Sequence, residues 1–259
     1  IRWKRAVKRI PLLGSEKEVN DALREVAAME SFNHPGIVRF HDAWKEQPPA
    51  GWQRASDELL MKELGCNNTV QYKDYCAFLY IQMELCPSTL SKWLSDTKVR
   101  DQRKTKSWFR QIVSAVGYIH KNGKIHRDLK PSNILISSDG VPKICDLGII
   151  ADCLIESGQE KAVSRTFAKG TSMYMAPEQF WGGYSSKVDV FALGLILVQL
   201  SVVITIEKAN EAFDNYRAGR PDSVLDKRPD VKPLVALLTN VKDTERPNCE
   251  EILKHPFLA

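Results

Sequence analysis

Residues 125–134, Ile-His-Arg-Asp-Leu-Lys-Pro-Ser-Asn-Ile, constrain this chain more than any other stretch of it. The carboxylate of Asp128 can take a proton from a hydroxyl group, and the ammonium of Lys130 can neutralise charge on a transferring group. Asn133 offers a carbonyl oxygen, which is a hard ligand that suits Mg²⁺. The spacing of these groups predicts a catalytic loop rather than an accidental polar turn after a helix.

A second oxygen ligand follows on the C-terminal side of this loop. Asp146 stands thirteen residues after Asn133, directly behind the strand-like run 142–145. Residues 146–148 resemble the D-F-G motif of protein kinases, and this resemblance implies that Asn133 and Asp146 hold Mg²⁺. We expect Gly148 to let the backbone bend sharply beyond them. The predicted catalytic residues are Asp128, Lys130, Asn133 and Asp146.

Together these segments resemble the motifs of the eukaryotic protein kinase catalytic domain. Residues 126–133 match H-R-D-L-x-x-x-N at every fixed position, and residues 146–148 match D-F-G with leucine in place of phenylalanine. Residues 176–178 supply A-P-E. The resemblance covers the chain except for about residues 45–75. It implies a serine/threonine protein kinase that transfers the γ-phosphate of ATP with the help of Mg²⁺.

The resemblance also assigns supporting roles in the second part of the chain. It implies that Glu178 of the A-P-E element pairs with Arg246, and that Asp189 caps the backbone of the catalytic loop. Arg127 is implied as the guanidinium that grips a phosphate on the activation segment. The structural set is therefore Arg127, Glu178, Asp189 and Arg246.

The first third of the chain resembles the ATP-binding part of a kinase. Residues 5–8 resemble the V-A-I-K strand, which implies that Lys8 binds the α- and β-phosphates and pairs with Glu25 on the following helix. Residues 79–86 resemble a hinge strand. The ATP-binding set is Lys8, Glu25, Met83, Glu84 and Cys86. The glycine-rich loop that precedes such a lysine is missing, so we expect the chain to be a fragment that lacks the start of its small lobe.

The order of elements predicts an α+β, bilobal protein kinase fold, with a small β-rich lobe at 1–85 and a larger helical lobe at 86–259. An insert at about 45–75 interrupts the small lobe. We expect strands at 1–10, 37–44, 78–83, 134–136 and 143–145. We expect helices at 16–32, 88–95, 103–121, 185–201, 207–217, 232–240 and 248–254.

The helix expected at 16–32 has a predicted buried face. Its apolar residues recur at helical spacing, and the predicted face consists of Val19, Leu23, Val26, Ala27 and Met29. A cleft between a strand-rich and a helix-rich lobe is a natural nucleotide site.

Composition excludes several other classes of protein. No window reaches the 18 or so uninterrupted apolar residues of a membrane span, so we expect this stretch to need no membrane contact. The six cysteines form no C-x-x-C pair, which argues against zinc. Cys86 and Cys145 lie in apolar runs that look like core, which favours reduced thiols. The net charge is +5, but no aromatic side chains interleave the basic run at 98–106. We therefore expect no nucleic-acid binding by this domain.

A narrower resemblance links the chain to the kinases of the α subunit of translation initiation factor two. It rests on residues 79–86, 128–134, 170–179 and 190–197. It implies a serine of that subunit as the substrate, docking through the helix at about 206–217, and a homodimer through the small lobe. Residues 34–40, 42–49 and 51–53 are most similar to the endoplasmic-reticulum member of the group, which implies the cytosolic domain of a single-pass membrane protein of the unfolded-protein response.

The same resemblance implies phosphorylation of the activation segment. Thr166 lies five residues before Thr171, the spacing of the activating threonine in this group. Thr171 is the competing site, although its hydroxyl is also implied to orient Asp128 and Lys130.

Other functions remain open at this point. The double-stranded-RNA-activated and heme-regulated members of the group are alternatives to the endoplasmic-reticulum member. A pseudokinase scaffold, a nucleic-acid module and a cell-cycle kinase of the Wee type are further alternatives. Magnesium-dependent ATP binding followed by phosphate transfer would separate an active kinase from a scaffold.

Overall fold

The computed structural model describes residues 4–12, 16–47, 49, 51, 52, 55, 77–147, 151, 152, 172–180, 185–220 and 222–258. The chain divides into two units. The first consists of Ile1–Ser31 and Arg39–Leu85, and the second of Phe32–Val38 and Cys86–Ala259. The segment Phe32–Val38 thus belongs with the helical part, although it precedes two strands of the first unit in sequence.

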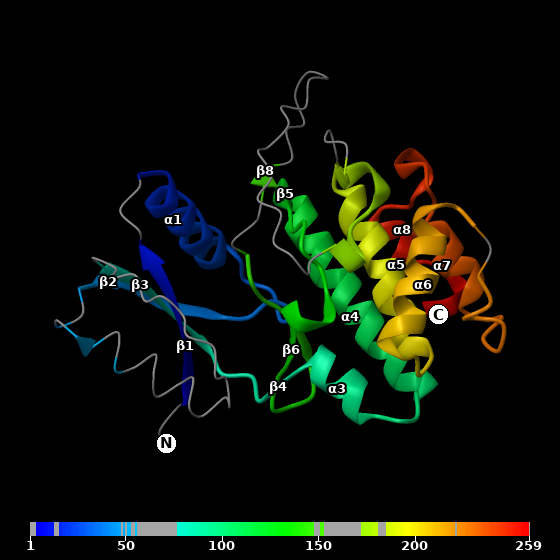
Figure 1. Ribbon diagram of the computed structural model, residues 1–259, viewed down its shortest axis with the longest axis horizontal. Helices are drawn as coiled ribbons and strands as arrows, with labels where there is room; N and C mark the ends of the chain where they lie inside the picture. Colours follow the sequence, from blue (N-terminus) through cyan, green and yellow to red (C-terminus); the bar gives the residue numbers. More distant parts are fainter. Residues whose placement is uncertain are drawn as a thin grey trace. The chain divides into compact units, whose positions relative to one another are not determined.

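The first unit is a three-stranded antiparallel sheet with the helix α1 (Glu16–Ser31) packed on β1 and β2 (Figure 1). The strands lie in the order β1 (Arg5–Leu12), β3 (Ala77–Glu84) and β2 (Phe40–Glu46). In the register, Lys8 is opposite Ile81, whose side chain is fully buried. Alternation along β3 places large apolar side chains in the core of this unit.

The predicted buried face of α1 is wrong in two of its residues. Leu23 is 52% exposed and Ala27 is also exposed. The buried stripe runs instead through Ala22, Glu25 and Ala28–Met29. The reason is that Glu25 faces the sheet, where it meets Lys8, and the neighbours three and four residues away turn inward with it.

The second unit is built mainly from helices. They are α3 (Leu90–Asp96), α4 (Gln102–Lys121), α5 (Lys187–Ser201), α6 (Ile206–Arg217), α7 (Lys232–Leu238) and α8 (Cys249–Leu253). Each lies within two residues of a helix expected from the sequence. Short 3₁₀ turns cover Pro131–Asn133, Ser172–Tyr174, Pro177–Phe180, Asp243–Glu245 and Pro256–Leu258. The predicted α+β fold class is confirmed.

Helix α5 forms the centre of this unit because it is apolar on every side. Nearly all of its residues are buried, from Val188 to Ser201, and it packs on α4 and α7 (Figure 1). Gly194 permits the close approach to α7, since a Cβ there would lie 2.6 Å from the Thr239 side chain. Asp189, in the first turn, is buried in this apolar setting at 1% exposure.

Short strands carry the loops of the second unit. One small sheet has the order β4 (Ser88–Thr89), β6 (Ile134–Ile136) and β7 (Pro142–Ile144), and a second pairs β5 (Lys124–Ile125) with β8 (Ala151–Asp152). The segment Phe32–Val38 joins this region through Ile144, whose N–H donates to the Gly36 carbonyl at 2.8 Å. The strands β4, β5 and β8 are two residues long, and the sequence pattern did not predict them.

Among the residues that the structure describes, no helix is long and apolar enough to span a bilayer.

Candidate active site

Asp128 is held from two sides by the residues that follow it. Lys130 Nζ lies 2.7 Å from Asp128 Oδ2, and Asn133 Nδ2 donates to the same oxygen at 3.0 Å. Asn133 Nδ2 also donates to the Asp128 main-chain carbonyl at 2.9 Å. Because Asp128 is only 8% exposed, these contacts fix the carboxylate in one orientation.

The two predicted metal ligands are brought close through the backbone. The Asn133 carbonyl accepts a hydrogen bond from Cys145 N at 3.0 Å, and Asp146 is the next residue. The side-chain nitrogen of Asn133 donates to Asp128. The side-chain oxygen of Asn133 is therefore the atom of this amide that can bind a metal ion. A carboxylate and an amide oxygen are the hard ligands that Mg²⁺ takes, so these residues fit the ion.

The backbone at Asp146 and Arg127 adopts an unusual conformation. Their φ angles are 61° and 67°, in the left-handed region that side-chain-bearing residues seldom occupy. Such backbone persists only where neighbouring contacts hold it, and it is common at functional sites. The sequence reading placed the sharp bend at Gly148, which lies outside the described residues, and did not anticipate it at Asp146.

Asp189 supplies the contacts that hold the loop backbone. Its carboxylate accepts from His126 N at 2.9 Å and from Arg127 N at 2.8 Å. The Arg127 carbonyl accepts in turn from the Gln179 side chain at 3.3 Å. A buried carboxylate on the central helix therefore grips the two peptide groups that precede Asp128.

The ring of His126 ties the catalytic loop to the strand before Asp146. Asp128 N donates to His126 Nδ1 at 3.3 Å, which assigns the ring proton to Nε2. That Nε2 lies 3.1 Å from the Cys145 carbonyl, to which it donates. The fully buried ring thus couples the positions of Asp128 and Asp146. In the sequence, His126 was identified only as part of the H-R-D motif.

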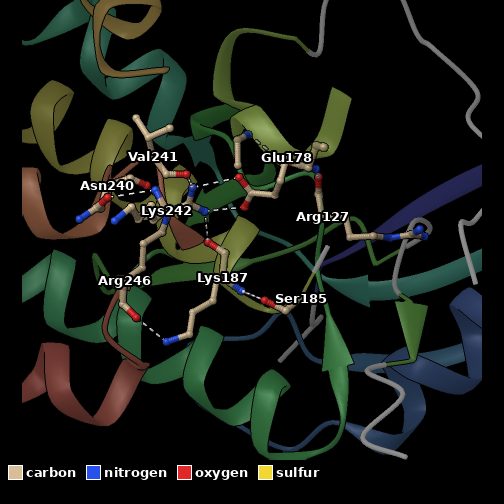
Figure 2. Close-up of polar contacts among 10 residues, drawn as sticks. Arg127, Glu178, Ser185, Lys187, Asn240, Val241, Lys242 and Arg246 are labelled. Carbon is tan, nitrogen blue, oxygen red and sulfur yellow. Dashed lines mark hydrogen bonds and ion pairs between the residues drawn. The ribbon is translucent and has the colours of Figure 1, made fainter. Parts of the chain in front are cut away.

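Glu178 and Arg246 form the second polar centre, shown in Figure 2. The guanidinium donates to both carboxylate oxygens, from Nη1 at 2.5 Å and from Nη2 at 2.9 Å. It also donates to main-chain carbonyls of Asn240 at 2.7 Å and Lys187 at 3.0 Å. The Arg127 side chain points away from this pair in Figure 2.

In the first unit, Lys8 on β1 meets Glu25 on α1. Lys8 Nζ lies 2.6 Å from Glu25 Oε1, and the Glu25 side chain is 6% exposed. In kinases this pairing belongs to the active arrangement of the small lobe.

The remaining ATP-binding candidates lie around the end of β3. Met83 and Glu84 are its last two residues, with Met83 buried, and Cys86 begins the second unit. Thr166 and Thr171 lie outside the described residues, so their assignment stays a prediction.

His120 is a contributor that motif reasoning missed. Its Nε2 lies 2.8 Å from Asp189 Oδ2, and its Nδ1 lies 3.8 Å from the Cys249 sulfur. Burial alone would lower the pKa of His120, but hydrogen bonds to Asp189 and Cys249 and the charge of Asp189 raise it to about 10. His120 is thus a cation at neutral pH, and it neutralises the buried Asp189.

Comparisons with known proteins agree with this geometry. The chain is 35% identical over 202 residues to eukaryotic translation initiation factor 2-alpha kinase pek-1 of Caenorhabditis elegans, covering 71% of this chain and 19% of that protein. It is 37% identical over 242 residues to the interferon-induced, double-stranded RNA-activated protein kinase of Mus musculus, covering 90% and 42%.

A third relative is the eIF-2-alpha kinase GCN2 of Arabidopsis thaliana, at 29% identity over 279 residues, covering 97% of this chain and 22% of that protein. The chain thus spans less than half the length of these curated relatives. The protein kinase domain model matches residues 3–258. With that match and this catalytic loop, the chain belongs to the protein kinase domain family.

Proposed function

We propose that this chain is the catalytic part of a serine/threonine kinase that phosphorylates the α subunit of translation initiation factor two. The observation that carries the proposal is the Asp128 carboxylate, fixed by Lys130 and Asn133 on a loop that Asp189 anchors. A pseudokinase has no need to keep a proton acceptor, a cation and two oxygen ligands in this arrangement.

The chemistry follows from where each group lies. Asp128 would orient the serine hydroxyl and accept its proton as the oxygen bonds to phosphorus. Lys130, beside the same carboxylate, would neutralise charge on the transferring phosphoryl group. Asn133 and Asp146 would hold Mg²⁺, which when bound offsets the negative charge of the phosphates. In the first unit, Lys8 would bind the α- and β-phosphates while Glu25 holds its ammonium.

The substrate is supported by the names of the relatives. The C. elegans and A. thaliana proteins are kinases of the initiation factor by name, and together they align with most of this chain. Helix α6 is the proposed docking element, and its first residue, Ile206, is 72% exposed.

The test uses purified protein with Mg²⁺ and ATP, and three acceptors: the folded α subunit, the same subunit with its acceptor serine changed to alanine, and a generic basic protein. Phosphate on the folded subunit alone, at the serine, supports the proposal. Phosphate on the basic protein alone indicates a kinase of another substrate. No transfer to any acceptor, despite nucleotide binding, indicates a scaffold.

We further propose membership of the endoplasmic-reticulum subgroup, which would make this stretch the cytosolic part of a single-pass membrane protein that forms a homodimer through its first unit. The likeness to pek-1 supports this placement. The second candidate is the RNA-activated subgroup, favoured by a match over 90% of the chain. Membrane fractionation of the full-length protein and its response to double-stranded RNA separate the two, and light scattering tests the dimer.

A further inference from the structure

Cys249 belongs to a row of three side chains outside the catalytic loop. The Cys249 sulfur lies 3.8 Å from His120 Nδ1, and the opposite ring nitrogen lies 2.8 Å from Asp189 Oδ2. The three residues come from the start of α8, the last turn of α4 and the first turn of α5. A thiol, an imidazole and a carboxylate in this order form the arrangement that activates nucleophilic cysteines in enzymes.

Cys249 is one of the residues that line a cavity of about 240 Å³. Gly117, His120, Lys187 and Cys249 are among the residues that line it. Cys249 is 5% exposed, so most of the residue is covered although it lines the cavity. The α4 backbone closes one side, because a Cβ at Gly117 would lie 3.0 Å from the Cys249 Cβ.

The charge on His120 favours reaction at this sulfur. The ring is a cation at neutral pH, for the reasons given above, and it lies in the last turn of α4, where the helix dipole also favours positive charge. The thiolate is the reactive form of cysteine, and an adjacent histidine cation stabilises it. Cys249 therefore has both a cavity beside it and an activating neighbour, His120. A cysteine that was merely buried would have neither.

We propose that Cys249 is a redox-modification site that small hydroperoxides oxidise to a sulfenic acid, and that this oxidation loosens the catalytic loop. The sulfur, as its anion beside His120, attacks one peroxide oxygen, so that an S–O bond forms as the O–O bond breaks. Sulfur loses two electrons and the peroxide gains them. With hydrogen peroxide the departing hydroxide takes a proton and leaves as water, so a thiol and hydrogen peroxide become a sulfenic acid and water; an organic hydroperoxide releases the corresponding alcohol instead.

The effect on the loop follows from the contacts of His120. Oxidation adds an oxygen to a sulfur that lies 3.8 Å from His120 Nδ1 and beside the cavity, so the new oxygen enters the cavity or presses against the imidazole. A displaced ring loses its contact with Asp189. The Asp189 carboxylate accepts hydrogen bonds from His126 N and Arg127 N, which precede Asp128. This second half of the proposal rests on the proposed kinase function, whereas the oxidation of Cys249 does not.

The first experiment measures which cysteine reacts. The full chain is treated with equimolar hydrogen peroxide and then dimedone, and each labelled cysteine is quantified by mass spectrometry. Cys86 and Cys145 are internal comparators because both are more exposed than Cys249. If the His120 contact decides reactivity, Cys249 is labelled fastest, and His120→Gln slows it by roughly tenfold or more. Faster labelling of Cys86 or Cys145, or an unchanged rate in His120→Gln, overturns the proposal.

The second experiment measures phosphate transfer to a generic protein before and after peroxide. We expect the kcat of the wild type to fall roughly three- to tenfold, which is the range for a coupling that acts through positioning contacts. Treatment with dithiothreitol should restore it. Cys249→Ala should keep its activity in peroxide, whereas Cys153→Ala should remain sensitive. Loss in Cys249→Ala equal to that of the wild type overturns the coupling. If the untreated enzyme transfers no phosphate, the proposed function fails. The labelling experiment still tests the proposed oxidation of Cys249.

Discussion

Arg246 grips Glu178 with two parallel hydrogen bonds across 68 residues of sequence. The Arg246 side chain has no exposed surface and that of Glu178 is 18% exposed. The guanidinium also lies over the Phe191 ring, with its carbon 4.9 Å from the ring centroid. Removal of one partner of such a buried pair leaves the other charge desolvated and without compensation.

We therefore predict that Arg246→Ala lowers the free energy of unfolding by roughly 3–5 kcal/mol. Arg246→Lys should recover only part of this, because an ammonium cannot reproduce the two parallel hydrogen bonds. Urea denaturation followed by fluorescence measures both. Lys92→Ala is the matched control, since its ion pair with Asp96 is solvent-exposed and should contribute little. Equal midpoints for Arg246→Ala and Lys92→Ala would contradict the prediction.

Asp128→Asn should slow phosphate transfer strongly without weakening nucleotide binding. The amide keeps the shape of the side chain and can still accept from Asn133, but it cannot take a proton. We expect kcat to fall by roughly 10²–10⁴, as for the loss of a general base, with ATP affinity unchanged in a calorimetric titration. Asp146→Asn should lower affinity for Mg²⁺-ATP as well, because it removes a ligand charge. Activity of Asp128→Asn within about tenfold of the wild type would refute the role of the carboxylate.

Much of the fold could be predicted from local pattern. The apolar run that forms α5 and the capped helices of the second unit were expected to within two residues. The buried face of α1 was predicted wrongly, because a periodicity argument orients apolar side chains and gives no weight to Glu25, which turns inward to reach Lys8. The two-residue strands β5 and β8 are too short to carry any pattern.

The candidate site divides in the same way. Spacing along the chain identified Asp128, Asn133 and Asp146, since these side chains belong to motifs. It could not reveal that His120 shares Asp189 with the loop backbone, because His120 lies 69 residues away and belongs to no motif. Nor could it give the left-handed backbone at Arg127, which depends on contacts made by distant elements.

The charge on His120 should make stability depend on pH. Its pKa rises from 6.5 to about 10 on folding, so the folded state binds a proton that the unfolded chain releases. This contribution is complete below about pH 6.5 and is lost as the pH rises toward 10, by about 1.4 kcal/mol per pH unit. We predict that wild type and His120→Gln, compared by urea denaturation at pH 7, 8 and 9, converge in stability as the pH rises. Curves that stay parallel would contradict a raised pKa for His120.

Charge reversal on the exposed face of α6 should impair only one substrate. Ala209, Ala212 and Phe213 are buried, whereas Glu207 and Glu211 are exposed. We predict that Glu207→Lys combined with Glu211→Lys lowers kcat/KM for the folded α subunit and leaves transfer to a generic basic protein unchanged. Asp96→Lys, on the exposed surface of α3, is the matched control. Equal losses on both substrates would refute docking through α6.

Phosphorylation of Thr166 should switch the kinase on through Arg127. A phosphate carries about −1.5 to −2 charges at neutral pH, and a guanidinium can bind it through two hydrogen bonds. Arg127 suits this role because its backbone is already fixed on both sides, by Asp189 at its N–H and by Gln179 at its carbonyl.

We predict that Thr166→Ala and Arg127→Ala both lose the rise in activity that follows preincubation with ATP. Thr171→Ala should still gain phosphate at Thr166, because the Thr171 hydroxyl is proposed to orient Asp128 and not to be the activating phosphorylation site. Mass spectrometry of active enzyme decides between the sites: full activity in Thr166→Ala, or active wild type without phosphate at Thr166, would place the switch elsewhere.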